Sequence, residues 1–250
     1  MTITTARPRT SSASADPTRN NGRGHARAGG IFYLVTFAVS IPALLMLDPI
    51  LNNPGYIVSG GHDTQVIWAC FLDFVNALAG IGSAVAVYPV VKRAHGSLAL
   101  GFVMSRMVEA AVIMIGVVAL LTVVTLHQDV AGNANIDASA LTTTGQALVA
   151  GRDWTFLFGP GFMACINAVL FGTLLYRSRL VPRVIPAMGL IGAPVLLTAN
   201  MLTLFGHLTQ TGTWSMLATL PVAAWELSVG FYLTFKGFQR SPAQAPAPTA

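Results

Sequence analysis

The sequence predicts an all-α membrane protein, a polytopic bundle of six transmembrane helices with both termini in the cytoplasm. Three observations lead to this fold class. Only 9% of the 250 residues are charged and 54% are hydrophobic, whereas a soluble domain carries about 25% charged residues. The apolar residues also fall in long runs instead of alternating with polar ones. Finally, the basic residues gather at the ends of these runs, where topology signals of membrane proteins lie.

Two polar tails are predicted to flank the membrane domain. Residues 1–28 are rich in Thr, Ser, Arg and Pro and contain few bulky apolar side chains, so they bury too little surface to offset the entropy lost on ordering. The last residues are similarly rich in Pro and Ala. We therefore expect a disordered cytoplasmic tail over 1–28, a six-helix transmembrane domain over 29–238 and a second disordered cytoplasmic tail over 239–250.

Six apolar segments lie between the tails, each close to the ~20 residues that cross the hydrocarbon core of a bilayer. Backbone polar groups must be satisfied within the chain in lipid, which favours helices. The first run ends without a small-residue cleavage site, so we interpret it as an uncleaved helix and not as a secretory signal. The predicted helices cover 30–50, 65–90, 98–125, 154–176, 184–206 and 214–236, with longer loops at 51–64 and 126–153.

The orientation follows from the positions of Lys and Arg. Of the 14 basic residues, all but Arg106 and Arg152 lie in the N-terminal tail, in the links after the second and fourth helices, or at the C-terminal end. Positive residues stay on the cytoplasmic side, so both termini are predicted to face the cytoplasm. No basic stripe with interleaved aromatic residues occurs in the sequence, so nucleic acid is not an expected partner.

Strongly polar residues occur well inside five of the six predicted helices. An ionised side chain at the bilayer centre costs at least ~2.5–3.5 kcal/mol, so these residues must face the bundle interior, a partner or water. Arg106 and Glu109 are three residues apart and therefore share one helix face. The predicted intramembrane polar cluster comprises Asp73, Asn76, Arg106, Glu109, Asn167, Asn200 and Glu226.

The charges of this cluster do not balance, because three acids face one base. Arg106 stays protonated and can neutralise one carboxylate, that of Glu109, with Glu226 sharing it. We expect at least one remaining acid, Asp73 or Glu226, to be neutral at pH 7 or to hold a cation from solution. Two interpretations stay open: the cluster only fixes helix packing, or it serves proton or cation coupling or the binding of a polar ligand.

The segment from Asp153 to Gly161 is predicted to open the fourth helix, with Asp153 as its N-terminal cap and Trp154 at the outer membrane face. The sequence Gly159-Pro160-Gly161 breaks the regular hydrogen-bond ladder. This helix break is either a packing kink or a binding site of the kind that transporters build from broken helices.

The sequence carries no catalytic motif of the HExxH or GxSxG type and no phosphate-binding loop, so an intramembrane enzyme stays open only as the least favoured of three functions, and no cofactor is expected. Cys70 and Cys165 lie singly in apolar runs and predict neither a disulfide nor a zinc site. His62, His127 and His207 lie on separate outer segments, so no metal site is predicted.

The two functions that the sequence favours over an enzyme are a small transporter or proton- or cation-coupled permease, and a non-catalytic membrane subunit, sensor or organiser. Six helices are few for a transporter, so a homodimer or another membrane subunit would be a partner in addition to the lipid bilayer.

Short stretches spread over about residues 30–238 match one known family. They include Arg106-Met-Val-Glu109, Asp153-Trp-Thr-Phe and Gly159-Pro-Gly-Phe, and the full set lies at 30–37, 53–57, 87–91, 106–110, 153–156, 159–162, 174–183 and 225–238. In these stretches the chain resembles a family of bacterial integral membrane proteins known as domain of unknown function 4386. The resemblance implies a multi-pass protein of the bacterial inner membrane and adds no activity.

Overall fold

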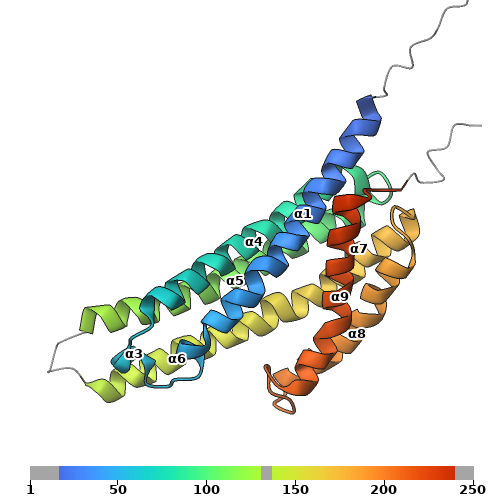
Figure 1. Ribbon diagram of the computed structural model, residues 1–250. Helices are drawn as coiled ribbons and strands as arrows, with labels where there is room; N and C mark the ends of the chain where they lie inside the picture. Colours follow the sequence, from blue (N-terminus) through green and yellow to red (C-terminus); the bar gives the residue numbers. More distant parts are fainter. Residues whose placement is uncertain (1–16, 131–136, 240–250) are drawn as a thin grey trace, which may run out of the picture.

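The computed structural model describes residues 17–130 and 137–239, and the regular structure of these residues is helical without a strand (Figure 1). The elements are α1 (Pro17–Met46), α2 (Asp48–Leu51), α3 (Tyr56–Ser59), α4 (Asp63–Val91), α5 (Gly96–Val130), α6 (Ala138–Phe156), the π-helix η1 (Leu157–Met163), α7 (Ala164–Ser178), α8 (Val184–Leu204) and α9 (Thr213–Phe235). Six helical stretches are long and apolar enough to cross a membrane, and α6, η1 and α7 together form one of them. The predicted all-α fold with six spans is confirmed.

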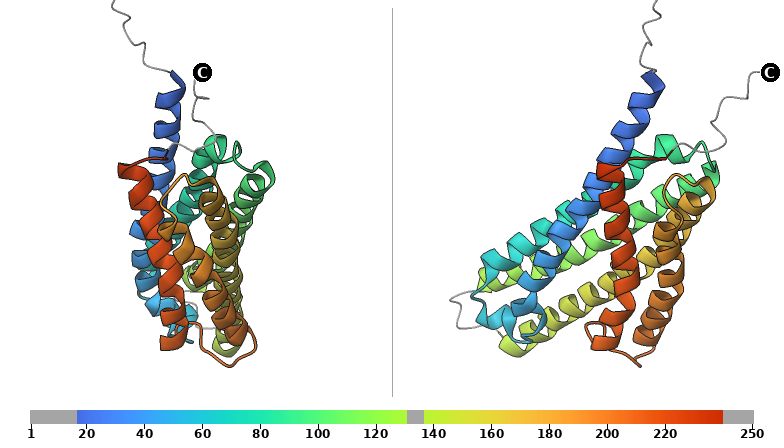
Figure 2. Two further views of the ribbon diagram at one scale, coloured as in Figure 1. Left: turned by 90° about the vertical axis from the view of Figure 1, so that its right-hand side faces the viewer. Right: turned by 45° about the vertical axis from the view of Figure 1, so that its right-hand side comes forward.

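The start of α1 and the end of α9 lie at the same end of the bundle, as six crossings require (Figure 1, Figure 2). We call this end the basic end; it carries Lys92, Arg93, Arg177, Arg179, Arg183 and Lys236. The opposite end, here the acidic end, carries Asp48, Asp63, Asp129 and Asp137. The positive-residue pattern assigns the basic end to the cytoplasm.

The link that we expected to be a loop over 126–153 is largely helical, and that prediction was wrong. α5 continues to Val130, and α6 already begins at Ala138. This stretch is rich in Ser, Thr and Gly, but it also carries an apolar stripe. Leu141 and Leu148 lie one heptad apart, and both pack against buried residues. The fourth span therefore extends far beyond the segment that hydropathy suggested.

The cap of this span is Asp137 and not Asp153. One oxygen of Asp137, Oδ1, accepts hydrogen bonds from the backbone N–H groups of Ser139 and Ala140 at 3.0 and 3.1 Å. Asp153 lies inside α6, so its predicted role as an N-terminal cap is corrected. A cap was expected at the start of the apolar run, but the helix starts where its backbone N–H groups find an acceptor.

The N-terminal tail predicted over 1–28 also requires a correction, because α1 begins at Pro17. Proline suits the first position of a helix, and Ala26 is fully buried, so the first span continues as an ordered helix beyond the apolar run. At the other end, the backbone N–H of Gln239 donates to the carbonyl of Leu180 at 2.7 Å. The rest of the predicted tails, residues 1–16 and 240–250, lies outside the described residues.

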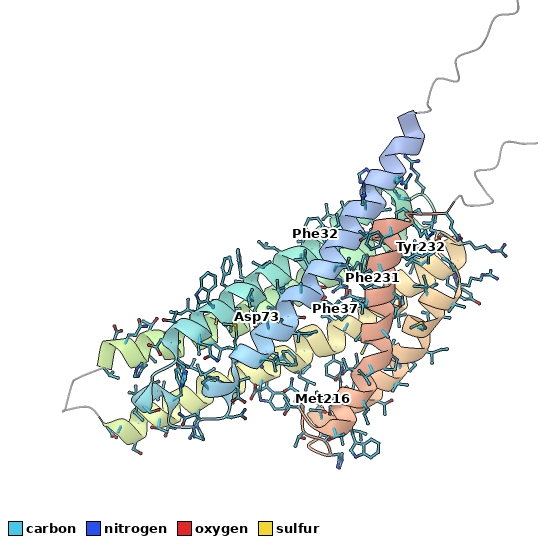
Figure 3. The ribbon with its side chains drawn as sticks, in the orientation of Figure 1. Phe32, Phe37, Asp73, Met216, Phe231 and Tyr232 are labelled. Atoms are coloured by element: carbon cyan, nitrogen blue, oxygen red, sulfur yellow. The ribbon has the colours of Figure 1, made fainter. Side chains whose placement is uncertain are left out.

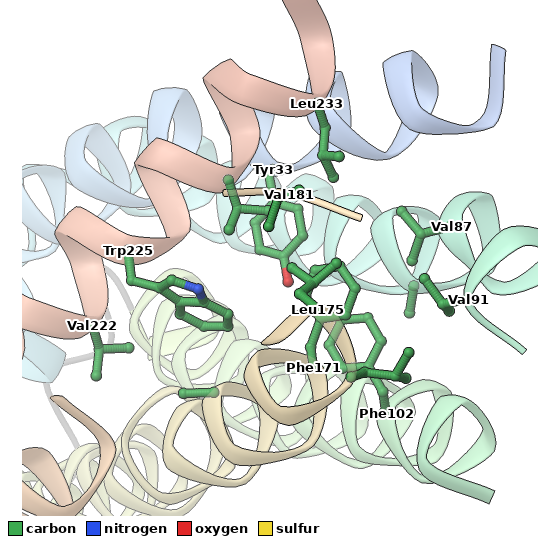
Figure 4. Packing of buried hydrophobic residues seen from close by; sticks show 14 of the residues in the cluster. Tyr33, Val87, Val91, Phe102, Phe171, Leu175, Val181, Val222, Trp225 and Leu233 are labelled. Carbon is green, nitrogen blue, oxygen red and sulfur yellow. The ribbon is translucent and has the colours of Figure 1, made fainter. Parts of the chain in front are cut away.

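The buried apolar side chains form two separate clusters. The basic-end core draws residues from all six spans, among them Tyr33, Val87, Phe102, Phe171, Ala193 and Trp225 (Figure 4). The acid-end core consists of Leu47, Ile50, Tyr56, Ile57, Val66, Ala69, Cys70, Val117, Leu120, Val123 and Val124. These residues come from the first three spans and the short helices between them, and α6 packs on their edge. Within the described chain, α8 and α9 contribute only to the basic-end core.

α1 and α9 cross closely near the basic end. A Cβ atom added at Gly30 would lie 2.5 Å from the backbone nitrogen of Thr234 and 2.7 Å from the carbonyl oxygen of Gly230, so only glycine allows this approach. The two helices separate towards the acidic end (Figure 1, Figure 2). The crossing thus fixes the point from which the bundle widens.

Candidate functional site

Arg106 on α5 joins carboxylates from two helices at the centre of the bundle. Its Nη1 donates to Glu109 Oε2 at 2.9 Å, and its Nη2 donates to Glu226 Oε1 on α9 at 2.7 Å. From α7, Asn167 Nδ2 also donates to Glu109 Oε2, at 2.7 Å. The pairing of Arg106 with both glutamates, expected from the sequence, is present in the structure. We call Arg106, Glu109 and Glu226 the ion trio.

Aromatic rings of the basic-end core hold Arg106 in place. Its Cζ atom lies 5.1 Å from the ring centre of Tyr33 and 5.8 Å from that of Phe102, close enough for cation–π attraction. The geometry of α5 also constrains the side chain of Arg106. Residues three apart share one face of a helix, so the carboxylate of Glu109 reaches the guanidinium of Arg106. The positive charge of the trio is thus anchored on the basic-end side.

The ion trio carries one more acid than base. Each glutamate uses one oxygen in the bonds above, and no donor from the described residues binds the other oxygen of either side chain. The side chains of Glu109 and Glu226 are 12% and 17% exposed, whereas that of Arg106 is 6% exposed. The carboxylates are therefore the more accessible part of the trio.

A cavity of about 560 Å³ lies on the acidic-end side of the ion trio. Its polar lining includes Ser40, Asp73, Asn76, Arg106, Glu109, Arg152, Asn200, Gln210 and Glu226. This volume falls within the range of small-molecule sites, about 300–1,000 Å³. The trio is therefore not sealed in a dry core, because a space large enough for a ligand reaches all three of its members.

Arg152 is a second base inside the bundle, and sequence reasoning missed it by placing it in an outer loop. It is buried on α6, where its Nη1 lies 3.6 Å from Asp153 Oδ1 and its Cζ lies 4.7 Å from the ring centre of Phe156. Together with Asp73 from α4, which Figure 3 labels, it lines the cavity. The signal that could have revealed it is Asp137, a helix-capping residue well before the apolar run.

The Gly-Pro-Gly segment lies within a continuous helical path. Leu157–Met163 forms a π-helix, so the spacing of the backbone hydrogen bonds changes there while the chain stays helical. Pro160 and Gly161 line the cavity, and Gly159 packs against Val112 of α5. Trp154 is half exposed on the surface of the bundle. Single π-helical turns inside α-helices are frequent at functional sites.

The remaining polar residues of the predicted cluster also lie around this cavity. Asn76 lines it from α4, and Asn200 lines it from α8 while its Nδ2 donates to Cys165 Sγ at 3.8 Å. Asn167 is fully buried behind Glu109. Several buried polar atoms have no hydrogen-bond partner among the described residues: Tyr33 Oη, Ser105 Oγ, Arg106 Nε, Asn167 Oδ1 and Trp225 Nε1. Most buried polar atoms are paired, so this concentration marks the region as unusual.

Metal-ligating side chains do not gather elsewhere in the described ranges, where no group of three or more His, Cys, Asp and Glu residues could hold an ion. His127 lies with its Nδ1 3.1 Å from the carbonyl oxygen of Ile57, and His62 precedes α4. The ion trio and its cavity thus remain the candidate site.

Comparison with known proteins assigns the chain to a family without adding an activity. The family model described as Domain of unknown function (DUF4386) matches residues 28–237. Searches of curated proteins and of solved structures gave no match. The matched region includes the last five spans in full, most of the first span, and every residue that lines the cavity in the described part of the chain. The chain therefore belongs to this family of multi-pass proteins of unknown function.

Proposed function

We propose that this protein is a small permease of the bacterial inner membrane, which binds its substrate in the cavity and couples to protons or cations through the ion trio. The observation that carries the proposal is the cavity that reaches Arg106, Glu109 and Glu226 between the spans. Ionisable residues inside a membrane are expensive and mark substrate or ion pathways in transport proteins.

The unequal charge of the ion trio supports coupling. Two carboxylates share one guanidinium, so a proton or a cation is needed to bring the trio to neutrality. Binding and release of that charge changes the attraction between α5 and α9, because the bond from Arg106 to Glu226 joins these two helices. An exchange of charge is thereby linked to a movement between helices.

The π-helix supports a hinge in the fourth span. Pro160 lies in η1 and lines the cavity, and a proline inside a helix removes one backbone hydrogen bond. A permease must expose its site to each side in turn, and a helix with a weakened ladder beside the site provides a place to bend. Since six spans are few for alternating access, a homodimer or another membrane subunit would complete the transporter.

Flux measurements in proteoliposomes test this proposal. We expect Glu226→Gln and Glu109→Gln to reduce proton or monovalent-cation flux at least tenfold, while Asp129→Asn, an exposed carboxylate at the acidic end, leaves it unchanged. Arg106→Gln should abolish flux and also destabilise the protein, because it leaves two carboxylates without their base. Folded variants with unchanged flux would overturn the proposal.

A second candidate function is that of a non-catalytic membrane subunit, sensor or organiser, in which the ion trio only locks α5, α7 and α9 in register. The mutual pairing of Arg106 with both glutamates favours it, because paired polar groups hold membrane helices together. In that case the charge-neutral glutamine variants would lower stability and leave every flux at the background of empty liposomes.

A further inference from the structure

The cavity has an apolar side that faces the lipid. Phe37, Ile41 and Leu44 line it from α1, and Met216 and Leu220 line it from α9. Figure 3 labels Phe37 and Met216. Ile41 and Leu220 are 56% and 58% exposed, so these side chains border the cavity and also reach the outer surface of the bundle. The two helices that carry these residues, α1 and α9, separate towards the acidic end (Figure 1).

One face of α9 in this wall is apolar up to the carboxylate of Glu226, and Ser215 and Thr219 lie beside this face in the lining. Met216, Leu220, Ala223 and Glu226 repeat at helical spacing on one face of α9, and all four line the cavity. At about 1.5 Å per residue, the apolar end of this face lies about 15 Å from the carboxylate. The site therefore offers an apolar slot at the membrane surface and a charged group at its inner end.

The charge at the inner end of the site determines which sign of charge a ligand must carry. The ion trio carries one excess carboxylate, and the accessible oxygen of Glu226 accepts no hydrogen bond from the described residues. The other ionisable residues of the lining, Arg152 and Asp73, are one base and one acid and add no net charge. A cationic group next to Glu226 is attracted, whereas an anion meets two carboxylates.

We propose that the cavity binds an amphiphilic cation, with an ammonium head at Glu226 and an apolar body between α1 and α9, which enters sideways from the bilayer. This inference rests on the proposed permease function only for the use of the cavity as a binding site, and it names the substrate class of that site. Three features must then act together: the carboxylate, the apolar slot and the gap between the two helices.

Binding to the purified protein in phosphatidylcholine nanodiscs tests the inference, with radiolabelled decyltrimethylammonium as the probe. We expect saturable binding that tetramethylammonium and decyl sulfate each displace at least tenfold less effectively than the unlabelled probe. Glu226→Gln should weaken binding roughly tenfold or more, because a charge-assisted contact is lost.

Two tryptophan substitutions separate the slot from the charge. Ile41→Trp fills the opening between α1 and α9 and should weaken binding at least tenfold with the ion trio intact. Ile191→Trp is the matched control, since Ile191 is 69% exposed on α8 and is not among the cavity-lining residues of the described chain. It should leave the affinity unchanged, and both variants keep the test valid if Glu226→Gln does not fold.

Three other results of the binding experiments would overturn the inference. Equal displacement by tetramethylammonium would mean that the apolar slot is not used, and equal displacement by decyl sulfate would mean that charge does not select the ligand. Unchanged affinity in Ile41→Trp would exclude entry between the two helices. Binding without any flux would overturn the permease and leave this inference standing, whereas flux that depends on Glu226 without binding of the probe would overturn this inference alone.

Discussion

The basic-end core and the acid-end core differ in how many spans they join. In the basic-end core, aromatic rings from four spans stack around Phe171, with ring centres 4.4 Å away for Phe102, 6.1 Å for Tyr33 and 6.4 Å for Trp225 (Figure 4). In the acid-end core, the described residues come only from the earlier spans and the short helices between them. The bundle is thus closed at one end, and at the other end α8 and α9 stand apart from the core.

This difference explains where the cavity lies. Apolar contacts hold all six spans together from the basic end as far as the ring of Tyr33. The ion trio follows directly on the acidic-end side of this ring, against which the guanidinium of Arg106 lies. Beyond the trio, α1 and α9 separate (Figure 1), and residues of both helices are among those that line the cavity. The cavity therefore lies on the acidic-end side of the ion trio, while packed apolar side chains fill the basic-end side.

The largest expected effect comes from the centre of the closed end. Phe171→Ala should destabilise the protein by about 3 kcal/mol, the lower part of the range for such truncations, because burial in a membrane bundle contributes packing more than transfer from water. Thermal unfolding in detergent measures the loss.

Phe231→Ala is the matched control for this prediction. Phe231 lies on α9 and is 49% exposed to the lipid-facing surface (Figure 3), so its removal should change the unfolding temperature little. Equal losses for the two variants would mean that the basic-end core does not hold the spans together.

The second effect concerns the crossing from which the bundle widens. Gly30→Ala should cost about 2 kcal/mol, because the added Cβ meets backbone atoms of α9, which cannot move aside as a side chain can. The same change at Gly80, in the cavity wall, meets no atom closer than Arg106 Cδ at 4.0 Å and should leave stability unchanged or slightly higher. A comparison of the two unfolding midpoints checks this, and a stable Gly30→Ala would refute the tight crossing.

Hydropathy and charge predicted the fold because each span must satisfy one strong condition, an apolar length that matches the bilayer. They failed at residues 138–153, where the fourth span begins with Ser, Thr and Gly. Helix formation there depends on the cap of Asp137 and on tertiary contacts of Leu141 and Leu148, which hydropathy does not detect. The early start of α1 at Pro17 was missed for the same reason.

The candidate site could be predicted in part. The ionic residues of the midplane were found because a charge in lipid must be paired, and this rule brought Arg106, Glu109 and Glu226 together. The cavity could not be predicted, since its lining comes from several helices, and their relative placement depends on close contacts between helices, such as that of Gly30 with α9, which the sequence does not reveal. Arg152 was missed because its helix was taken for a loop, so the error in the fold became an error in the site.

The smallest expected effect lies at the acidic end and tests whether that end is held locally. Asp137→Ala removes the acceptor for the N–H groups of Ser139 and Ala140, and loss of such a cap costs about 1 kcal/mol. Asp137→Asn keeps an oxygen in place and should cost much less. If α6 is held mainly by its own cap, amide exchange should speed up several-fold over the first turns of α6 in the alanine variant and stay unchanged at Phe171. If amide exchange instead rises throughout the bundle, the two ends unfold together. The interpretation that the acidic end is held independently of the basic end, on which access to the cavity depends, would then be wrong.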